Sequence, residues 1–287
     1  MVYNKNNNTV FIMFQPVIKW SGSKRSQSSE IIKYFPKEID TYYEPFCGGA
    51  SMLYALMISD IKVDKYFCSD INSDLINLWK YIKNDPYVLS CEYERMWKEL
   101  NKDKDVARQK EYYNRVRTVF NEDRYPAQFL FLNRTCFNGL IRYNSYGEFN
   151  SPFHLNRPGI EPNKLSRIIE KWSELLQKND VTFVTCNYKE ILSLECDFMY
   201  IDPPYANTNG MYSGNFDNEE FFKWLKTVRA DWALSYDGKS GNDDNTYDVP
   251  KDLYSQHVYI KSGNSSFKRI KQSDNKAMVF ESLYLKK

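Results

Sequence analysis

The sequence predicts an α/β fold in which a mainly parallel sheet, covered by helices, is interrupted by a long helical insertion. Strand and helix patterns alternate near the N-terminus, which is typical of parallel sheets with crossover helices. The elements expected there are strands at 41–44 and 65–69, a helix at 50–59, and a second helix from a cap at Asn72 or Ser73 to about Lys83. Strand patterns then disappear for about a hundred residues and resume at Val181.

These patterns divide the chain into three parts. Residues 10–84 and 181–287 are expected to form two halves of one sheet domain, and residues 85–180 a mostly helical insertion with a hairpin near 138–150. The second half contains strand patterns at 181–186, 198–201 and 232–236, an acidic loop at 237–252, and a terminal antiparallel pair at 254–261 and 277–284.

Charge is nearly balanced over the 287 residues, with 39 Lys and Arg against 37 Asp and Glu. Residues 102–142 are locally basic, with nine cations against five acids, and the segment 256–287 is basic as well. Such zones are compatible with phosphate contacts, but solvated helix faces explain them equally well. Both interpretations remain open from composition alone.

The six cysteines and two histidines form no zinc-binding pattern, so no metal site is predicted. The N-terminus lacks the layout of a signal peptide, and no apolar stretch is long enough to span a bilayer. A reducing cytoplasm is therefore the expected location.

The sequence Asp-Pro-Pro-Tyr at 202–205 follows the buried strand expected at Phe198–Ile201. The two prolines lack backbone N–H groups and have φ fixed at about −65°. The result is a stiff loop with several hydrogen-bond acceptors and one aromatic ring. Such a loop suits a planar group that carries an amine, such as a nucleobase, although the motif alone is also compatible with a simple rigid turn.

A second motif, Glu-Pro-Phe-Cys-Gly-Gly-Ala-Ser at 44–51, lies between an expected strand and helix. Glycines there let the backbone approach a ligand closely, and Asp70, at the end of the next strand, is placed to bind ribose hydroxyls. No phosphate-loop Gly-Lys-Ser/Thr follows, which favours a nucleoside without phosphates, such as S-adenosylmethionine. A tight structural turn and a helix-cap aspartate are the alternatives. Lys24 is either a contact for a ligand carboxylate or a solvated surface residue.

The order of these motifs resembles the alpha class of amino-methyltransferases. It begins with Lys-Trp-x-Gly-x-Lys at 19–24, continues through 44–51 and Asp70, and ends with 202–205. The segments Phe-Leu-Asn-Arg at 131–134, Phe-Asn-Gly-Leu at 137–140, Arg-Tyr-Asn at 142–144 and Gly-Glu-Phe-Asn-x-Pro-Phe at 147–153 narrow the resemblance to the Dam-type DNA adenine methyltransferases. One departure is Ala50, where the family usually has glycine; we expect Gly49 to supply the flexibility.

The resemblance, which runs from about residue 17 to 284, implies a Rossmann-like S-adenosylmethionine-dependent methyltransferase. Its expected substrate is the exocyclic amine of a flipped adenine in double-stranded DNA, within GATC. The parts 10–84 and 181–287 then form the catalytic domain, and 85–180 the target-recognition insertion. The resemblance assigns catalysis to Asp202, Pro203, Pro204 and Tyr205; cofactor binding to Trp20, Lys24, Glu44, Phe46, Gly48, Asp70 and Asp202; and DNA binding to Arg142, Asn138, Leu140, Arg134 and Pro152.

In the expected mechanism Asp202 and the carbonyl of Pro203 each accept one amine hydrogen, and Tyr205 stacks on the base. Arg142 is the first candidate for a guanine contact. For Arg134 a phosphate clamp or a structural ion pair is favoured over base readout. Tyr143 and Tyr146 are interpreted equally well as stacking or as packing residues.

Two other functions stay open from the sequence. One is the same chemistry on another amine, in cytosine of DNA or adenine of RNA. The other is a catalytically weak nucleic-acid-binding protein that keeps the scaffold. The chain is expected to act as a monomer, and the sequence leaves open whether a cognate restriction endonuclease accompanies it.

Overall fold

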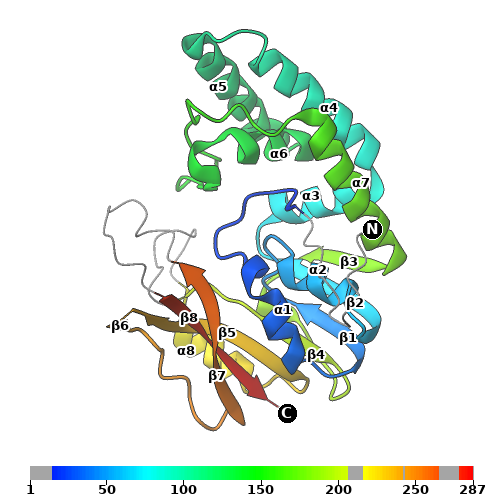
Figure 1. The fold of residues 1–287 in the computed structure, drawn as a ribbon, viewed down its shortest axis with the longest axis vertical. Coiled ribbons are helices and arrows are strands. Elements are labelled where there is room, and N and C mark those ends of the chain that lie inside the picture. The colour runs from blue at the N-terminus through cyan, green and yellow to red at the C-terminus, as the bar shows by residue number, and fades with distance from the viewer. Residues whose placement is uncertain (1–14, 206–215, 242, 265–277, 287) are drawn as a thin grey trace, which may run out of the picture.

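The computed structural model describes residues 15–205, 216–241, 243–264 and 278–286 (Figure 1). The strands are β1 (Glu38–Glu44), β2 (Lys62–Asp70), β3 (Val181–Thr185), β4 (Phe198–Ile201), β5 (Asp231–Ser240), β6 (Asp243–Asp244), β7 (Gln256–Asn264) and β8 (Met278–Lys286). The helices are α1 (Ser28–Ile31), α2 (Ser51–Met57), α3 (Ser73–Asn84), α4 (Pro86–Leu100), α5 (Val106–Asp123), α6 (Pro126–Thr135), α7 (Pro162–Lys178) and α8 (Asn218–Leu225). Short 3-10 turns lie at Lys24–Ser26, Ile32–Tyr34, Phe137–Gly139 and Tyr188–Glu190. Among the described helices, none combines the length and apolarity that a bilayer span requires.

The strands form one mixed sheet in the order β3-β2-β1-β4-β5-β8-β7, with β6 paired to β5. The pairs from β3 to β5 are parallel, whereas β8 pairs antiparallel with both β5 and β7. The parallel sheet and the terminal antiparallel pair agree with the sequence prediction. The strand order reverses between β1 and β4, and in open α/β sheets ligands bind at the carboxyl ends of the strands beside such a reversal.

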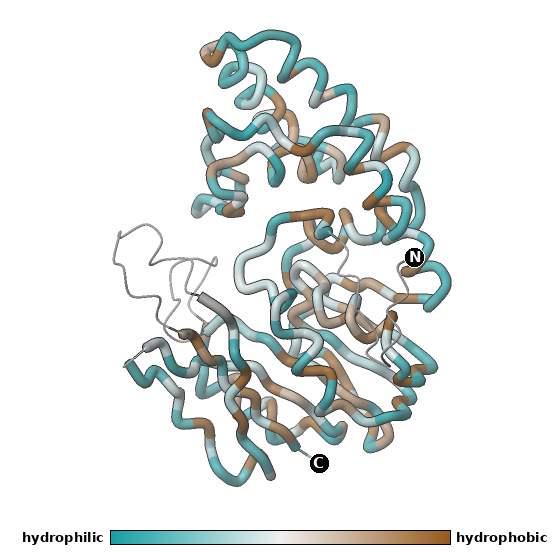
Figure 2. Tube along the Cα trace, in the orientation of Figure 1, coloured by the Kyte–Doolittle hydropathy of each residue, from teal (hydrophilic) through white to brown (hydrophobic). Residues whose placement is uncertain are grey.

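Helices cover both faces of the sheet. Along β4, successive side chains point to opposite faces, so the strand contributes to an apolar core on each side. Phe198 and Tyr200 belong to the apolar core shared with α1 and α2, whereas Met199 and Ile201 belong to the core shared with α8. All four residues are buried, as expected for a central parallel strand. Figure 2 shows hydrophobic residues along the central strands and hydrophilic ones over the outer turns of α4 and α5.

The insertion between α3 and β3 consists mainly of α4, α5, α6 and α7, which Figure 1 shows gathered above the sheet. Its centre is α6, which is buried over most of its surface and starts with a proline at its first turn. The side chains of Asp105 and Glu161 accept backbone N–H groups at the starts of α5 and α7. The segment between α6 and α7 carries the predicted hairpin.

The predicted loop at 237–252 is partly wrong. Strand β5 continues to Ser240 and pairs with β8 on both sides of a register shift between Tyr236 and Lys239, and β6 adds a short pair. Gly238 explains why the pairing resumes, because a Cβ there would lie 2.2 Å from the carbonyl oxygen of Phe280. Gly238 suggested a turn in the sequence, but in the structure it permits a close approach of β8.

The predicted strand 277–284 corresponds to β8. Its first residue, Ala277, lies outside the described residues.

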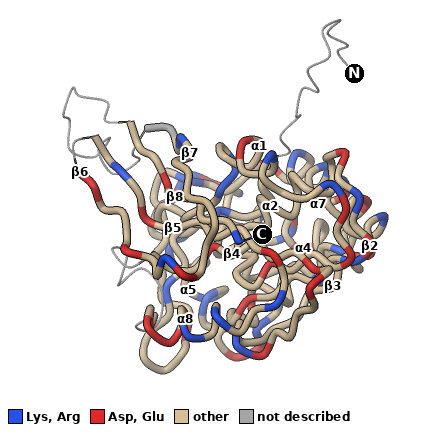
Figure 3. The backbone as a smooth tube through the Cα atoms, turned by 90° about the horizontal axis from the view of Figure 1, so that it is seen from below, with Lys and Arg blue, Asp and Glu red and all other residues tan. Residues whose placement is uncertain are grey.

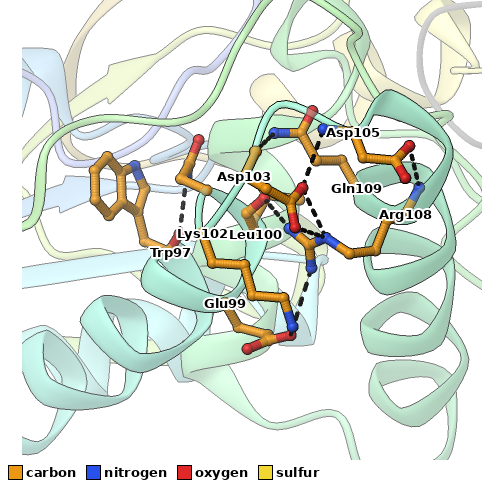
Figure 4. A network of polar contacts seen from close by, with 9 residues as sticks. Trp97, Glu99, Leu100, Lys102, Asp103, Asp105, Arg108 and Gln109 are labelled. Carbon is orange, nitrogen blue, oxygen red and sulfur yellow. Dashed lines mark hydrogen bonds and ion pairs between the residues drawn. The ribbon is translucent and has the colours of Figure 1, made fainter.

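Three of the nine cations in the basic zone at 102–142, Lys102, Arg108 and Arg124, pair with acidic side chains within the protein. At the junction of α4 and α5, Lys102 pairs with Glu99, and Arg108 pairs with Glu99 and Asp103 (Figure 4). Figure 3 shows cations and acids interspersed along the chain. Surface pairs of this kind stabilise a fold only weakly, so this junction is a solvated, internally paired surface.

Candidate active site

The three sequence motifs that end strands meet at one edge of the sheet. The turn after β1, the carboxylate of Asp70 at the end of β2, and the loop after β4 all lie at the carboxyl ends of neighbouring parallel strands. This edge flanks the reversal of strand order. The topology therefore brings together a glycine turn, two carboxylates and an aromatic ring, from segments up to about 160 residues apart.

The turn after β1 is shaped by left-handed backbone and by Trp20. Gly48 has φ +45° and Ala50 has φ +53°, whereas Gly49 has no positive φ. The expectation that Gly49 replaces the missing family glycine is therefore wrong, because Ala50 itself adopts the left-handed conformation and caps α2. A Cβ on Gly48 would lie 2.5 Å from Nε1 of Trp20, so only glycine lets the turn pack this closely against the ring.

We expect Gly48→Ala to lower the free energy of unfolding by at least about 2 kcal/mol, because left-handed backbone and overlap with Trp20 both oppose a methyl group. Gly49→Ala is the matched control, since its Cβ would approach Trp20 Cβ only to 3.1 Å and its φ is not positive. Denaturant unfolding of both variants measures the difference. An equal decrease in the free energy of unfolding in the two variants would contradict this description of the turn.

The carboxylate of Asp70 holds the glycine turn in place. It accepts the backbone N–H groups of Gly48 at 3.2 Å and of Asn72 at 3.0 Å. Burial raises the pKa of Asp70 to about 6 although these hydrogen bonds lower it. The carboxylate is thus ionised at neutral pH and keeps acceptor capacity for hydroxyl groups. Ile71 follows with 75 % of its surface exposed, which offers apolar area beside these acceptors.

Glu44 lies deeper than predicted for a ligand contact. It is 3 % exposed, and its Oε2 accepts the hydroxyl of Tyr42 at 2.8 Å. Burial raises the pKa of Glu44 to about 8, and the nearby charge of Asp202 adds to this effect. Glu44 is therefore mainly protonated at neutral pH. Phe46 is half-buried and packs on Tyr188 with ring centroids 5.3 Å apart.

The structure places Lys24 in a buried cluster of charged side chains. Its ammonium lies 2.7 Å from Oδ2 of Asp202 and 3.4 Å from Oε2 of Glu281, and it donates to the carbonyl of Gly22 at 3.0 Å. The residue is only 4 % exposed. It is therefore not the solvated surface lysine that the sequence offered as one alternative, and its contact with a ligand carboxylate stays a prediction. It bridges two carboxylates, one from the loop after β4 and one from β8.

Glu281 completes this cluster, which we call the Lys24 cluster (Lys24, Asp202, Tyr205 and Glu281). Its carboxylate accepts the hydroxyl of Tyr205 at 2.8 Å and that of Ser262 at 2.9 Å. The sequence analysis missed Glu281. A single acid within the apolar strand Met278–Lys286 was the available signal, because an unpaired charge inside a strand that faces a core is costly. With one cation and two carboxylates, the ionised cluster has a net charge of −1.

The pKa values in the cluster follow from burial and pairing. Burial raises the pKa of Asp202 to about 6, Lys24 opposes this rise, and the charge of Glu281 adds to it. Burial also acts to raise the pKa of Glu281, but Lys24 and hydrogen bonds outweigh it, so that this pKa is lowered. Burial acts to lower the pKa of Lys24, and the two carboxylates reverse the shift. At neutral pH Asp202 is an ionised acceptor whose basicity exceeds that of an ordinary aspartate.

If Asp202 accepts an amine hydrogen, as the sequence predicts, methyl transfer should decline by about tenfold per pH unit below about pH 6, because protonation removes that acceptor. Single-turnover rates between pH 5 and 8 measure this dependence. Glu281→Gln should shift the inflection to lower pH, since the charge that raises the pKa of Asp202 is lost. A rate that stays constant down to pH 5 in the unmodified protein would contradict the role of Asp202.

The loop after Asp202 is stiff, and its ring is anchored. Tyr205 lies with its hydroxyl on Glu281, and the ammonium of Lys24 is 4.9 Å from the centre of its ring. The ring of Tyr236 is 5.7 Å away at 46°. Pro203 is buried and Pro204 is half-buried. The loop therefore presents a fixed carboxylate and a fixed ring at the strand end.

The predicted hairpin forms between α6 and α7, closed by a bridge between Tyr143 and Phe149. The backbone of Arg142 is held by Asn150 N–H, 2.9 Å from its carbonyl oxygen, and by Ser151 Oγ, 3.0 Å from its nitrogen. The side chain of Arg142 is exposed, and no described residue pairs with its guanidinium. The structure thus presents an exposed guanidinium, unpaired among the described residues, on a fixed backbone.

The other predicted DNA-contacting residues divide into surface and interior positions. Asn138 and Pro152 are exposed, and Leu140 is partly exposed. Arg134 is 7 % exposed and donates to the carbonyl oxygens of Val17, at 2.6 Å, and Pro16. Burial lowers the pKa of Arg134 to about 10. Arg134 is thus a structural residue that ties α6 to the segment before Lys24, and neither a phosphate clamp nor an ion pair.

The aromatic residues around the hairpin are placed differently from one another. Tyr143 packs edge-on against Phe149, with its hydroxyl on Asp74, so packing is its role. Tyr146 is 88 % exposed. Phe137, which the sequence analysis did not select, is 49 % exposed and stacks on His154 at 5.4 Å. Its position directly before the candidate Asn138 was the signal available in the sequence.

Comparison with known proteins agrees with this geometry. The sequence matches the family described as D12 class N6 adenine-specific DNA methyltransferase over residues 20–280. It is 36 % identical to the type II methyltransferase M.MjaIII of Methanocaldococcus jannaschii, over 68 % of this chain and 70 % of that protein. It is 32 % identical to a DNA adenine methylase of Haemophilus influenzae, over 77 % of this chain and 74 % of that protein. The chain therefore belongs to the D12 class of N6 adenine-specific DNA methyltransferases.

Proposed function

We propose that this S-adenosylmethionine-dependent DNA adenine methyltransferase acts on an adenine that is flipped out of the duplex at GATC sites. The observation that carries the proposal is the shared edge of the sheet. There an ionised Asp202 on a stiff loop lies next to the glycine turn and Asp70. The edge thus has acceptors for an amine and acceptors for a nucleoside at neighbouring strand ends.

The residues present fit S-adenosylmethionine. The ionised Asp70 offers acceptors for ribose hydroxyls, and the exposed side chain of Ile71 offers an apolar surface for a purine. The turn at Gly48, held against Trp20, would form the floor of the site. When bound, the cofactor supplies an electrophilic methyl group on a sulfonium. The Lys24 cluster, with its net charge of −1, is favourable for such a cation.

The amine of adenine is a weak nucleophile because its lone pair is delocalised into the ring. Asp202 would accept one amine hydrogen and the Pro203 carbonyl the other, which directs the lone pair out of the ring plane. The carboxylate also stabilises positive charge that develops on the nitrogen during transfer. Because Glu281 lies within 3.4 Å of Lys24 Nζ, that cation can shift its contact and leave Asp202 free for the amine. Tyr205 would hold the base by stacking.

Access to the amine requires base flipping, since the atom is shielded in a stacked duplex. The hairpin carries the exposed Arg142, whose guanidinium suits the two acceptors of guanine in the major groove. In Dam-type enzymes, which this chain resembles, a hairpin arginine contacts the guanine of GATC. Asn138, Leu140 and Pro152 occupy matching positions and support the same site.

We also infer that the protein acts as a monomer, because one chain contains the strand-end motifs and the hairpin. One similar protein is named a type II methyltransferase and another a DNA adenine methylase. Because the first of these names refers to a type II methyltransferase, we propose that a companion restriction endonuclease accompanies this protein. A GATC-cleaving activity in extracts of the source cells, blocked on DNA that this protein has methylated, would support that proposal, and its absence would contradict it.

Transfer of tritium from labelled S-adenosylmethionine to duplexes tests the function. One duplex contains GATC, the second has the adenine replaced by 2-aminopurine, and the third is an RNA of the same sequence. We expect label only in the first. Label in the RNA, or in the 2-aminopurine duplex, would overturn the substrate; equal label in a fourth duplex, in which the guanine of GATC is replaced, would overturn the site. Absence of label from all DNA, with the protein folded, would overturn the activity.

A further inference from the structure

The hairpin is tied to the cofactor end of the sheet by one buried carboxylate, Asp74, in the first turn of α3 (Ser73–Asn84). Asp74 is 5 % exposed. Its Oδ2 accepts the hydroxyl of Tyr143 at 2.7 Å and Nη1 of Arg124 at 3.1 Å. The second nitrogen of Arg124 donates to the carbonyl oxygen of Gly147 at 2.7 Å. Asp74 thus holds the hairpin both directly and through the arginine that ends α5.

On its other side, the same network reaches the glycine turn. Asn72 donates from its side-chain amide to the hydroxyl of Tyr143 at 3.4 Å, and its side-chain oxygen caps α3. The backbone N–H of Asn72 donates to Asp70, whose other oxygen accepts the N–H of Gly48. A continuous set of hydrogen bonds therefore runs from Gly48 through Asp70, Asn72 and Tyr143 to Asp74.

Two features indicate that this placement is enforced. Arg124 ends α5 in the left-handed conformation that is common at helix C-termini, and from there its guanidinium reaches both Asp74 and the carbonyl of Gly147. Tyr143 is the neighbour of Arg142 in the hairpin, so successive side chains point to opposite sides. Tyr143 points inward to Asp74, and Arg142 is exposed. The hydroxyl of Tyr143 thus anchors, at Asp74, the hairpin strand that also carries Arg142.

We propose that Asp74 is a positioning residue that couples cofactor binding to site recognition, by fixing the hairpin against the residues that surround the cofactor. The inference rests on the proposed role of the hairpin in reading DNA. A ligand that orders Asp70 and Asn72 also orders Tyr143 and the hairpin. Coupling of this kind is reciprocal, so cognate DNA must strengthen cofactor binding by the same factor by which the cofactor strengthens cognate DNA binding.

The test uses Tyr143→Phe, which removes the hydroxyl but keeps the ring packed on Phe149. Tyr125→Phe is the matched control. Its hydroxyl also joins α3 to the insertion, through Tyr81 at 3.1 Å, but it does not contact the hairpin. Asp74→Asn is a second variant of the network. For each protein, binding of S-adenosylhomocysteine is measured by calorimetry alone, with a GATC duplex, and with a duplex altered at the guanine.

We expect the GATC duplex to strengthen binding of S-adenosylhomocysteine to the unmodified protein and to Tyr125→Phe by about tenfold or more. In Tyr143→Phe this enhancement should fall to below about threefold, while binding without DNA stays within about twofold. The ratio of kcat/KM between GATC and the altered duplex should fall in parallel.

Three results decide the inference. Unchanged enhancement and unchanged discrimination in both folded network variants would overturn it, as would an unmodified protein whose cofactor binding ignores DNA. Loss of discrimination in Tyr125→Phe as well would show a general effect of the insertion and overturn the specific role of Asp74. Failure of the unmodified protein to methylate GATC would instead overturn the proposed function.

Discussion

Asp202→Ala is expected to reduce methyl transfer by at least about a thousandfold while leaving a folded protein. The substitution removes the acceptor that holds the amine and stabilises charge on its nitrogen. The fold should survive because Lys24 keeps a second carboxylate, Glu281, at 3.4 Å. The raised pKa of Asp202 also indicates that its ionised form is costly in the fold, so its loss removes little stability.

Single-turnover transfer of a labelled methyl group measures the loss, with thermal unfolding as the check on folding. Asp202→Asn is the matched control, since its amide oxygen can still accept one hydrogen but has no charge. It should retain more activity than the alanine variant and far less than the unmodified protein. Turnover within about tenfold of the unmodified rate in a folded Asp202→Ala protein would contradict the role assigned to this carboxylate.

Arg142→Ala is expected to lose discrimination between GATC and sites altered at the guanine, by about 1–3 kcal/mol in kcat/KM. The reason is that an exposed guanidinium at this position could bind both guanine acceptors at once. Arg142→Lys separates charge from geometry, because lysine keeps the attraction for phosphates without the paired donors. It should lose most of the discrimination while retaining affinity for DNA. Site preference unchanged in both variants would exclude the contact.

The strand-end motifs could be predicted because each consists of an apolar strand pattern followed directly by the polar or glycine residues that a binding site needs. Asp202 follows four buried residues, and the glycine turn follows an expected strand, so their meeting at one sheet edge follows from parallel topology alone. The hairpin was predictable from its turn residues. Each of these features depends on neighbours in the sequence.

The partners of these residues could not be predicted, because they depend on tertiary packing. Lys24 looks like a surface cation, yet it is buried between carboxylates that follow it by 178 and about 257 positions. Arg134 has the same charge as Arg142 but lies on the buried helix α6. Asp74 looks like an ordinary acid in a helix first turn. Which of them faces solvent is decided by the stacking of the insertion on α3.

The central claim is that this protein methylates adenine within GATC, with Asp202 holding the amine of the adenine and Arg142 recognising the guanine. The most direct measurement is digestion of DNA treated with this protein and S-adenosylmethionine, using one nuclease that requires methylated GATC and another that methylation blocks. The account predicts cleavage by the first and protection from the second. DNA that has incorporated methyl groups but stays resistant to the first nuclease and open to the second would contradict it.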